Sequence, residues 1–122
     1  MDITLRRVTH ANFGELADLA VREDQREFVA SNAVSIMEAY TTLVEGGVAL
    51  PFGIYAGDTP VGFLMIGYDC LDWEDAPAVA RGAYCLWRLM IDARYQGRGY
   101  GRRALQQALS YIRTFPCGPS EH

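Results

Sequence analysis

A segment rich in glycine and arginine, residues 94–103, contains the residues best suited to bind a ligand. Its sequence is Arg-Tyr-Gln-Gly-Arg-Gly-Tyr-Gly-Arg-Arg. Glycine allows the backbone to turn tightly, so that several N–H groups face one concavity and a bulky anion can approach the chain. At the start of a helix, unpaired amides and the positive end of the helix dipole favour phosphate in the same place. The arginines add full positive charges, so this segment is predicted to bind a phosphate group.

Spacing separates the known phosphate-binding motifs that could explain this segment. A P-loop has lysine and then serine or threonine after its last glycine, whereas Gly101 is followed by two arginines. A Rossmann fingerprint has the spacing G-x-G-x-x-G, but Gly97, Gly99 and Gly101 follow the spacing G-x-G-x-G. Both motifs are therefore excluded. An ordinary glycine turn remains as the alternative to a phosphate site.

The residues that flank this segment are predicted to place it between a strand and a helix. Residues 83–91 form a nearly continuous apolar run, which indicates a strand buried on both faces. In residues 99–113 the apolar side chains recur on one side of a helix. The turn would then join the end of a core strand to the start of an amphipathic helix.

The rest of the chain is predicted to complete an α+β or mixed-sheet domain. A strand over residues 3–8 precedes a first helix of about three turns that starts after Asn12. Residues 51–56 and 61–68 are predicted strands of an antiparallel hairpin with a four-residue turn. A second helix follows Asn32, with apolar residues at helical spacing: Val34, Met37, Tyr40, Leu43 and Val44.

Composition excludes several classes of protein. A chain of 122 residues, half of them hydrophobic, is sized for one domain, predicted to span residues 1–122. No apolar run approaches the roughly eighteen residues of a membrane helix, and the N-terminus lacks the regions of a signal peptide, so a cytoplasmic protein without membrane contact is expected. The three cysteines, without a CxxC pair, and two distant histidines support neither a disulfide framework nor a metal site.

The net charge of −4 conceals a division along the chain. Residues 81–113 contain seven arginines and a single carboxylate, Asp92, whereas the remainder carries four arginines and fourteen carboxylates. The first part suits an anion and the second part suits a cation. Because the chain is acidic overall and has no recognised nucleic-acid-binding motif, binding to nucleic acid is not expected.

Gln96, Gly99 and Gly101 match the pattern Q/R-x-x-G-x-G/A, which resembles the pyrophosphate-binding signature of the GNAT superfamily of N-acetyltransferases. The order of the upstream elements is also similar to the first half of that superfamily, so the resemblance spans nearly the whole chain. It implies a mixed, mostly antiparallel sheet flanked by helices, and acetyl-CoA as co-substrate. The implied acetyl-CoA contacts are Leu89, Met90, Ile91, Gln96, Gly97, Arg98, Gly99, Tyr100, Gly101 and Arg102.

Three stretches, within residues 25–35, 51–55 and 87–92, are similar to the bacterial diamine and spermidine N-acetyltransferase branch. This resemblance implies acetyl transfer to a primary amine of a small polyamine such as spermidine. The candidate acceptor-binding residues are Glu23, Asp24, Glu27, Trp73 and Glu74, with Asp72 as a further carboxylate. The alternative is that these carboxylates are solvated loop charges and that the tryptophan closes an edge of the core.

The family resemblance implies direct transfer, in which the amine attacks the thioester carbon without a serine or cysteine nucleophile. One backbone N–H group of residues 89–91 would polarise the thioester carbonyl. Some relatives carry a glutamate base on the strand before the turn, but the matching position here is Trp87, next to Arg88. The catalytic base and acid are therefore not assigned, and Arg88 is either ion-paired or near the ligand.

The superfamily usually continues after this helix with a strand, a helix carrying a tyrosine acid, and two closing strands, which these 122 residues lack. Tyr111 lies on the preceding helix and is not equivalent to that tyrosine. An incomplete domain is therefore expected, either shortened or completed by a second copy through an exposed strand edge. An acetyltransferase and a non-catalytic acyl-CoA-binding module both remain as hypotheses.

Overall fold

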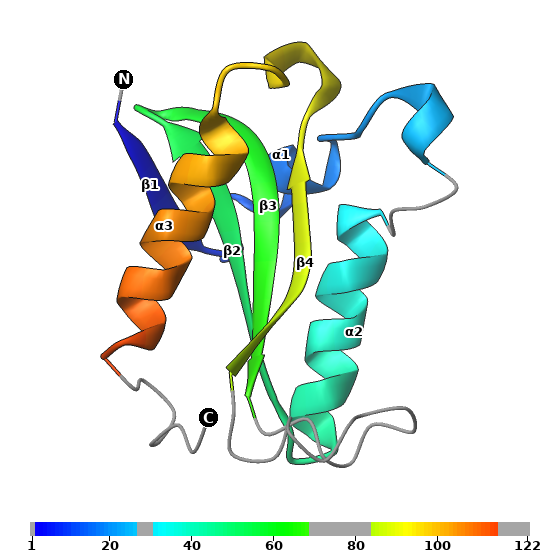
Figure 1. Ribbon diagram of the computed structural model, residues 1–122. Helices are drawn as coiled ribbons and strands as arrows, with labels where there is room; N and C mark the ends of the chain where they lie inside the picture. Colours follow the sequence, from blue (N-terminus) through cyan, green and yellow to red (C-terminus); the bar gives the residue numbers. More distant parts are fainter. Residues whose placement is uncertain (1, 27–30, 69–83, 115–122) are drawn as a thin grey trace.

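The computed structural model describes residues 2–26, 31–68 and 84–114. In these ranges four strands form one antiparallel sheet in the order β1, β2, β3, β4 (Figure 1). The strands are β1 (Ile3–Arg7), β2 (Val48–Ala56), β3 (Thr59–Tyr68) and β4 (Tyr84–Ile91). The helices are α1 (Phe13–Ala17), α2 (Asn32–Val44) and α3 (Tyr100–Ile112), with short 3-10 helices at Glu23–Gln25 and Ala93–Tyr95. The predicted α+β fold with an antiparallel sheet and flanking helices is confirmed.

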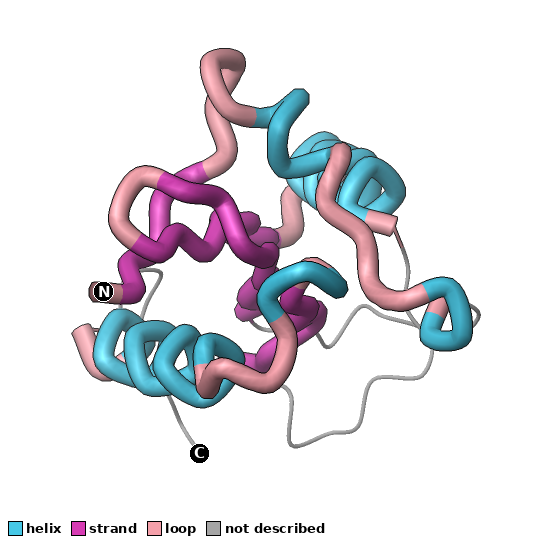
Figure 2. The backbone as a smooth tube through the Cα atoms, turned by 90° about the horizontal axis from the view of Figure 1, so that it is seen from above, coloured by secondary structure: helices cyan, strands magenta, loops and turns pink. Residues whose placement is uncertain are grey.

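Helices cover both faces of the sheet, α3 on one and α1 and α2 on the other (Figure 1). Figure 2 shows the sheet between these helices in a view from above. Because successive side chains of a strand point to opposite faces, β3 needs apolar residues at every position, and Val61 to Gly67 are all buried. The α3 face buries Ile54, Leu64, Ile66, Ala104 and Ala108, among others. The opposite face buries Leu16, Ala39, Tyr55, Phe63, Met65 and Met90, among others.

The hairpin between β2 and β3 is tighter than predicted. Ala56 pairs with Thr59 and Tyr55 pairs with Pro60, so the turn has two residues, Gly57 and Asp58, and the predicted four-residue turn is wrong. Gly57 has a φ of 62°, which glycine adopts without strain and which suits a two-residue hairpin turn.

The first helix is shorter than the predicted three turns, because the end of β4 competes for the residues that would extend it. The Ala20 N–H donates to Asp92 Oδ2 at 3.0 Å, and the Ala20 carbonyl accepts from the Ala93 N–H at 2.9 Å. These bonds hold the chain after Ala17 outside a helix. Asn12 precedes the helix as predicted but does not cap it with its side chain, because its Oδ1 accepts from the Thr9 N–H at 2.7 Å instead.

The apolar residues that predicted the second helix do not face the sheet. Helix α2 forms as expected after its N-cap residue Ser31, whose hydroxyl accepts from the Val34 N–H at 3.2 Å. A helical period identifies a helix but not the side that faces the core. Between 48% and 69% of the surface stays exposed at Val34, Met37, Tyr40, Leu43 and Val44, whereas Asn32, Ser35 and Ala39 are buried.

Strand β4 is not buried on both faces in the described part of the chain, contrary to the prediction. Met90 is 7% exposed, but Leu86 is 41% exposed, and most other β4 side chains are half-buried. The apolar run indicates burial but not the position of the strand in the sheet. Within the described residues β4 pairs with β3 alone, so its second edge has no described neighbour.

Gly62 of β3 pairs with Ile91 of β4 and packs tightly against that strand. We therefore expect Gly62→Ala to destabilise the fold. A Cβ atom there would overlap the Met90 carbonyl oxygen and lie 2.9 Å from Ile91 Cδ1. Urea unfolding should show a free energy of unfolding lower by about 1–3 kcal/mol. Gly14→Ala is the matched control, because nothing lies within 4 Å of its added Cβ, and its stability should be unchanged or slightly higher. Equal stability of the two variants would contradict this packing.

Candidate functional site

The turn between the 3-10 helix and α3 leaves its backbone amides open. Gly97 and Gly99 have φ angles of 80° and 79°, and a Cβ atom at either would meet nothing within 4 Å. The first backbone bond of α3 runs from the Arg103 N–H to the Gly99 carbonyl. Within the described ranges, the N–H groups of residues 97–102 donate to no protein acceptor. A row of unpaired amides at a helix start is a site for an anion, so the predicted cradle has the required backbone geometry.

Positive charge surrounds this turn. Arg98 and Arg102 are exposed on it, and the guanidinium carbon of Arg98 lies 5.7 Å from the centre of the Tyr95 ring. Arg94 contacts the same ring from 5.2 Å but is also paired with Asp92 at 2.9 Å. The two arginines on the turn are thus suited to bind an anion, whereas Arg94 has a structural ion pair.

A buried carboxylate anchors the start of the turn. Asp92 is 4% exposed; its Oδ1 accepts from the Arg94 N–H at 3.0 Å and from Arg94 Nε at 2.9 Å, and its Oδ2 accepts from the Ala20 N–H. Burial alone would raise the pKa of Asp92, but the hydrogen bonds from the Arg94 side chain and from the two backbone N–H groups lower it below its ordinary value of 3.8. The carboxylate therefore stays charged and fixes the end of β4 against the segment after α1.

The Gln96 side chain holds the turn from within. Its Nε2 donates to the Ile91 carbonyl and to Gln25 Oε1, both at 3.0 Å. The Gln25 oxygen also accepts from the Arg22 N–H at 3.1 Å, which links the Glu23–Gln25 helix to the turn. Because both amide hydrogens of Gln96 are used inside the protein, its side chain positions the turn. A direct contact with acetyl-CoA stays a prediction.

A groove leads from the turn along β4. It measures about 450 Å³ and brings together five of the ten predicted strand and turn contacts with two residues that sequence reasoning missed, Val21 and Gln25. The other five predicted contacts do not line it: Gly97, Arg98, Gly99, Tyr100 and Arg102. The lining residues are Val21, Gln25, Leu89, Met90, Ile91, Gln96 and Gly101. One continuous surface therefore joins the strand to the phosphate-binding turn, as an extended ligand requires.

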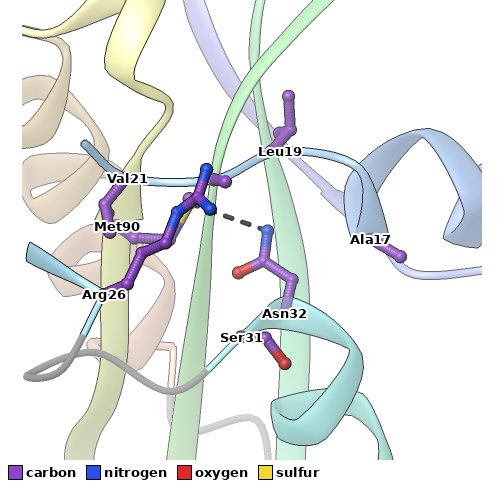
Figure 3. A pocket seen from close by; sticks show the side chains of 8 residues that line it. Ala17, Leu19, Val21, Arg26, Ser31, Asn32 and Met90 are labelled. Carbon is purple, nitrogen blue, oxygen red and sulfur yellow. Dashed lines mark hydrogen bonds between the residues drawn. The ribbon is translucent and has the colours of Figure 1, made fainter. Parts of the chain in front are cut away.

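A second cavity of about 330 Å³ adjoins this groove on the side of α1 and α2 (Figure 3). The two spaces share Val21 and Met90, so a molecule in one would meet a molecule in the other at these side chains. The second cavity is lined by Ala17, Leu19, Ala20, Val21, Arg26, Ser31, Asn32 and Met90. The signal that could have found Asn32 is its place in the polyamine-acetyltransferase-like stretch.

A β-bulge lies in β4 next to these cavities. Met65 pairs with Arg88 but Ile66 pairs with Leu86, so Trp87 is the extra residue of the strand. Trp87 packs against the core on the α1 and α2 face. Bulges re-aim side chains near functional sites, and here the re-aimed side chain carries no carboxylate.

Arg88, which the sequence left as either ion-paired or near the ligand, is ion-paired. Its guanidinium lies 2.9 Å from the Glu38 carboxylate of α2. It also donates to the Trp87 carbonyl at 3.1 Å and lies over the Trp87 ring. The pair joins β4 to α2 and therefore has a structural role.

The structure does not bring the described acceptor candidates into either cavity. Glu23 and Asp24 are exposed on the short helix, and Asp24 accepts from Arg22 at 3.3 Å. The remaining candidates lie outside the described residues: Glu27, Asp72, Trp73 and Glu74.

In the described ranges no helix is long and apolar enough to cross a membrane. Within the same ranges no group of three or more histidine, cysteine, aspartate or glutamate residues could hold a metal ion.

Open amides at a helix start, next to an apolar groove along an edge strand, give this α+β domain a surface suited to an extended ligand that carries a phosphate group. The model of the Acetyltransferase (GNAT) family matches residues 20–119. The chain therefore belongs to the GNAT family of acetyltransferases, whose enzymes use acetyl-CoA as the acetyl donor.

Similar proteins include two acetyltransferases from Bacillus subtilis. The spermine/spermidine N(1)-acetyltransferase of strain 168 is 32% identical over 116 residues, which cover 92% of this chain and 69% of that protein. The probable spermine N(1)-acetyltransferase of subspecies natto, strain BEST195, is 31% identical over the same shares. The chain is thus shorter than both relatives.

Solved structures share the fold at lower identity. An acetyltransferase from Thermus thermophilus matches with a TM-score of 0.62 at 20% identity, over 90% of this chain and 69% of that one. The PaiA N-acetyltransferase of Thermoplasma acidophilum, crystallised with coenzyme A, matches with a TM-score of 0.58 at 15% identity, over 94% and 74%. These matches support the fold.

Replacing Asp92 should destabilise the protein in a way that depends on pH. In Asp92→Asn one carboxylate oxygen becomes a donor, so one buried N–H group loses its acceptor, which costs about 1–3 kcal/mol at pH 7. Because folding lowers the pKa of Asp92, its contribution is present above the ordinary value of 3.8 and is lost as the pH falls through the folded value. Urea unfolding from pH 7 to pH 3 should show the gap between wild type and variant narrowing. Asp58→Asn, at an exposed pair with Arg6, is the control and should change little; a gap that widens in acid would contradict this role.

Proposed function

We propose that this chain holds the pyrophosphate of acetyl-CoA on the amides of residues 97–102 and transfers the acetyl group to a primary amine of a small polyamine such as spermidine. The observation that carries the proposal is the row of unpaired amides at the start of α3, with the groove of Leu89, Met90 and Ile91 leading away from it. A doubly charged group on these amides would also meet Arg98 and Arg102.

Three observations support a polyamine as the acceptor. The Bacillus relatives are named for spermine and spermidine acetylation. Outside residues 81–113 the chain carries fourteen carboxylates and four arginines, which attracts a cation to that part of the protein. Finally, the cavity next to the groove has a mostly apolar lining, which suits the methylenes of an aliphatic amine.

Backbone groups at residues 89–91 of β4 would act on the thioester. An edge strand presents alternate N–H and C=O groups that make no ladder bond, and within the described residues β4 pairs on one side only. Acetyl-CoA supplies the activated acyl group, and an N–H of residues 89–91 would stabilise negative charge on its carbonyl oxygen. The amine nitrogen forms the new C–N bond, the C–S bond breaks, the thiolate leaves with the electron pair, and the amine loses a proton.

A non-catalytic acyl-CoA-binding module is the second candidate, and the lining of the site favours it in one respect. Among the described residues no carboxylate lines either cavity. Trp87 stands at the position that matches the glutamate base of some relatives. Tyr111 packs edge-on against Phe52 at 5.3 Å in the core of the α3 face. Release of thiol from acetyl-CoA in the presence of spermidine separates the two candidates.

Completion of the sheet by a second copy at the β4 edge stays a prediction.

Gly101 gives the sharpest test of the phosphate cradle. It lines the groove, and an added Cβ would meet only Ile91 Cγ1, at an ordinary 3.7 Å. Gly99 is less suitable, since its φ of 79° makes any side chain strain the backbone. We expect Gly101→Glu to weaken coenzyme A binding by at least about tenfold, because a carboxylate would face the pyrophosphate.

Isothermal titration calorimetry with coenzyme A measures this effect. Gly101→Ala is the matched control and should keep the affinity within about twofold, since its methyl group fits. Urea unfolding should give similar stability for both variants. Equal binding by wild type and Gly101→Glu would place the pyrophosphate elsewhere.

A further inference from the structure

We infer that Asn32 is the residue that positions the acceptor amine, and that its side-chain oxygen accepts a hydrogen bond from the amine in the smaller cavity. The inference rests on the proposed function and adds to it the group that recognises the nucleophile. It names a neutral amide oxygen, in place of the carboxylates that the sequence suggested.

The place of Asn32 in the fold is unusual for a polar side chain. It is the first residue of α2 and only 2% exposed. Its Nδ2 donates to the Leu16 carbonyl at 2.8 Å and lies 3.6 Å from Met90 Sδ. The Asn32 side chain of α2 therefore contacts both α1 and β4. Its contact on β4 is Met90, which lines both cavities.

These partners decide which way the amide points. The Leu16 carbonyl can only accept, so the nitrogen of Asn32 must face it and the oxygen must turn the other way. Figure 3 shows this oxygen directed into the cavity, on the side of Arg26 and Ser31. No described residue donates a hydrogen bond to it. This oxygen is therefore open to a hydrogen bond from a molecule in the cavity.

The rest of the lining selects the chemistry of that ligand. Five of the lining residues are apolar: Ala17, Leu19, Ala20, Val21 and Met90. The Ser31 hydroxyl already accepts from the Val34 N–H. The cavity thus offers the Asn32 oxygen as an acceptor beside a mostly apolar wall, which matches a donor group at the end of an aliphatic chain. A carboxylate or carbonyl group would face the Asn32 oxygen without a hydrogen to share.

Arg26 limits how a polyamine can lie in this cavity. It is exposed at the rim, and no ion pair to it occurs within the described ranges. Its positive charge disfavours a second ammonium close to the first. The terminal amine would therefore enter alone, with the remainder of the polyamine leading away from Arg26 toward solvent.

Met90 places the bound amine beside the acetyl donor. It lines both the cavity and the groove, and its sulfur lies next to the Asn32 amide. An amine that donates one N–H to the Asn32 oxygen keeps its lone pair for the thioester carbon once its extra proton has left. Asn32 would then orient the nucleophile without taking its proton.

Two substitutions separate the oxygen from the rest of the side chain. Both Asn32→Ala and Asn32→Asp lose the donor to the Leu16 carbonyl, but only the alanine variant also loses the oxygen. We expect Asn32→Ala to raise the KM for spermidine roughly tenfold, and the aspartate variant to recover most of that loss. The KM for acetyl-CoA and the affinity for coenzyme A should stay within about twofold in both.

Other results of this experiment would overturn the inference. A purely structural residue would shift both KM values together and would leave the aspartate variant as impaired as the alanine variant. An unchanged KM for spermidine in Asn32→Ala would exclude the hydrogen bond. Far-ultraviolet circular dichroism and urea unfolding establish that the variants compared are folded.

A competition experiment on the wild-type chain covers the case in which neither variant folds. n-Butylamine should displace spermidine, as measured by calorimetry, whereas butyrate should not, because only the amine can donate to the Asn32 oxygen. Displacement by butyrate would overturn the inference.

Calorimetry with spermidine in the absence of coenzyme A distinguishes a failure of this inference from a failure of the proposed function. Spermidine binding that depends on Asn32 but gives no turnover would support this site and refute acetyl transfer.

Discussion

The buried carboxylate of Asp92 joins the parts of the chain that make the site. It accepts hydrogen bonds from Ala20 after α1 and from the backbone and side chain of Arg94 in the turn. The Ala93 N–H returns a bond to the Ala20 carbonyl. These contacts decide where β4 stops and where the turn begins. They also bring the segment after α1 against β4, so that Ala17, Leu19 and Ala20 line the smaller cavity and Val21 lines both spaces. Without this junction the segment after α1 would not place Val21 between the groove and the smaller cavity.

The site lies at β4 because β4 is an edge strand of the described sheet. A central strand uses its backbone groups on both sides and has none to offer a ligand. The inner strands provide the rigid support, since β3 is buried along nearly its full length. Next to this support, the turn can leave a row of amides without a protein acceptor. These amides are exposed to solvent, so leaving them unpaired costs little free energy. The fold therefore separates the buried strands β2 and β3, which supply stability, from the candidate binding surface on β4 and the turn.

Amide side chains, and no described carboxylate, carry the polar contacts at the cavities. Gln96 and Gln25 hold the turn from inside, and Asn32 spans α1, α2 and β4. An amide can be buried at lower cost than a charge, and it donates and accepts at once. Under the proposal, the amide oxygen of Asn32 would orient an amine without holding it as the ammonium partner of a carboxylate.

Sequence alone determined the properties that depend on local geometry. The glycine spacing at 97, 99 and 101 specified a turn open to phosphate, and the apolar periods specified the order of strands and helices. Their limits agree with the structure to within a few residues, apart from the first helix, and the family follows from the same motif. These features need only neighbouring residues, because backbone freedom and side-chain period act over a few positions.

Tertiary structure decided what depends on contacts between distant segments. It shortened α1 through Asp92, turned the apolar side of α2 outward, and paired Arg88 with Glu38. It also brought Asn32 to Met90, fifty-eight positions further along the chain. No local pattern encodes such a meeting, since it arises from how the helices pack on the sheet. For the same reason charge alone suggested Glu23 and Asp24 as acceptor-binding residues but could not predict their positions in the fold. In the structure both lie at the surface.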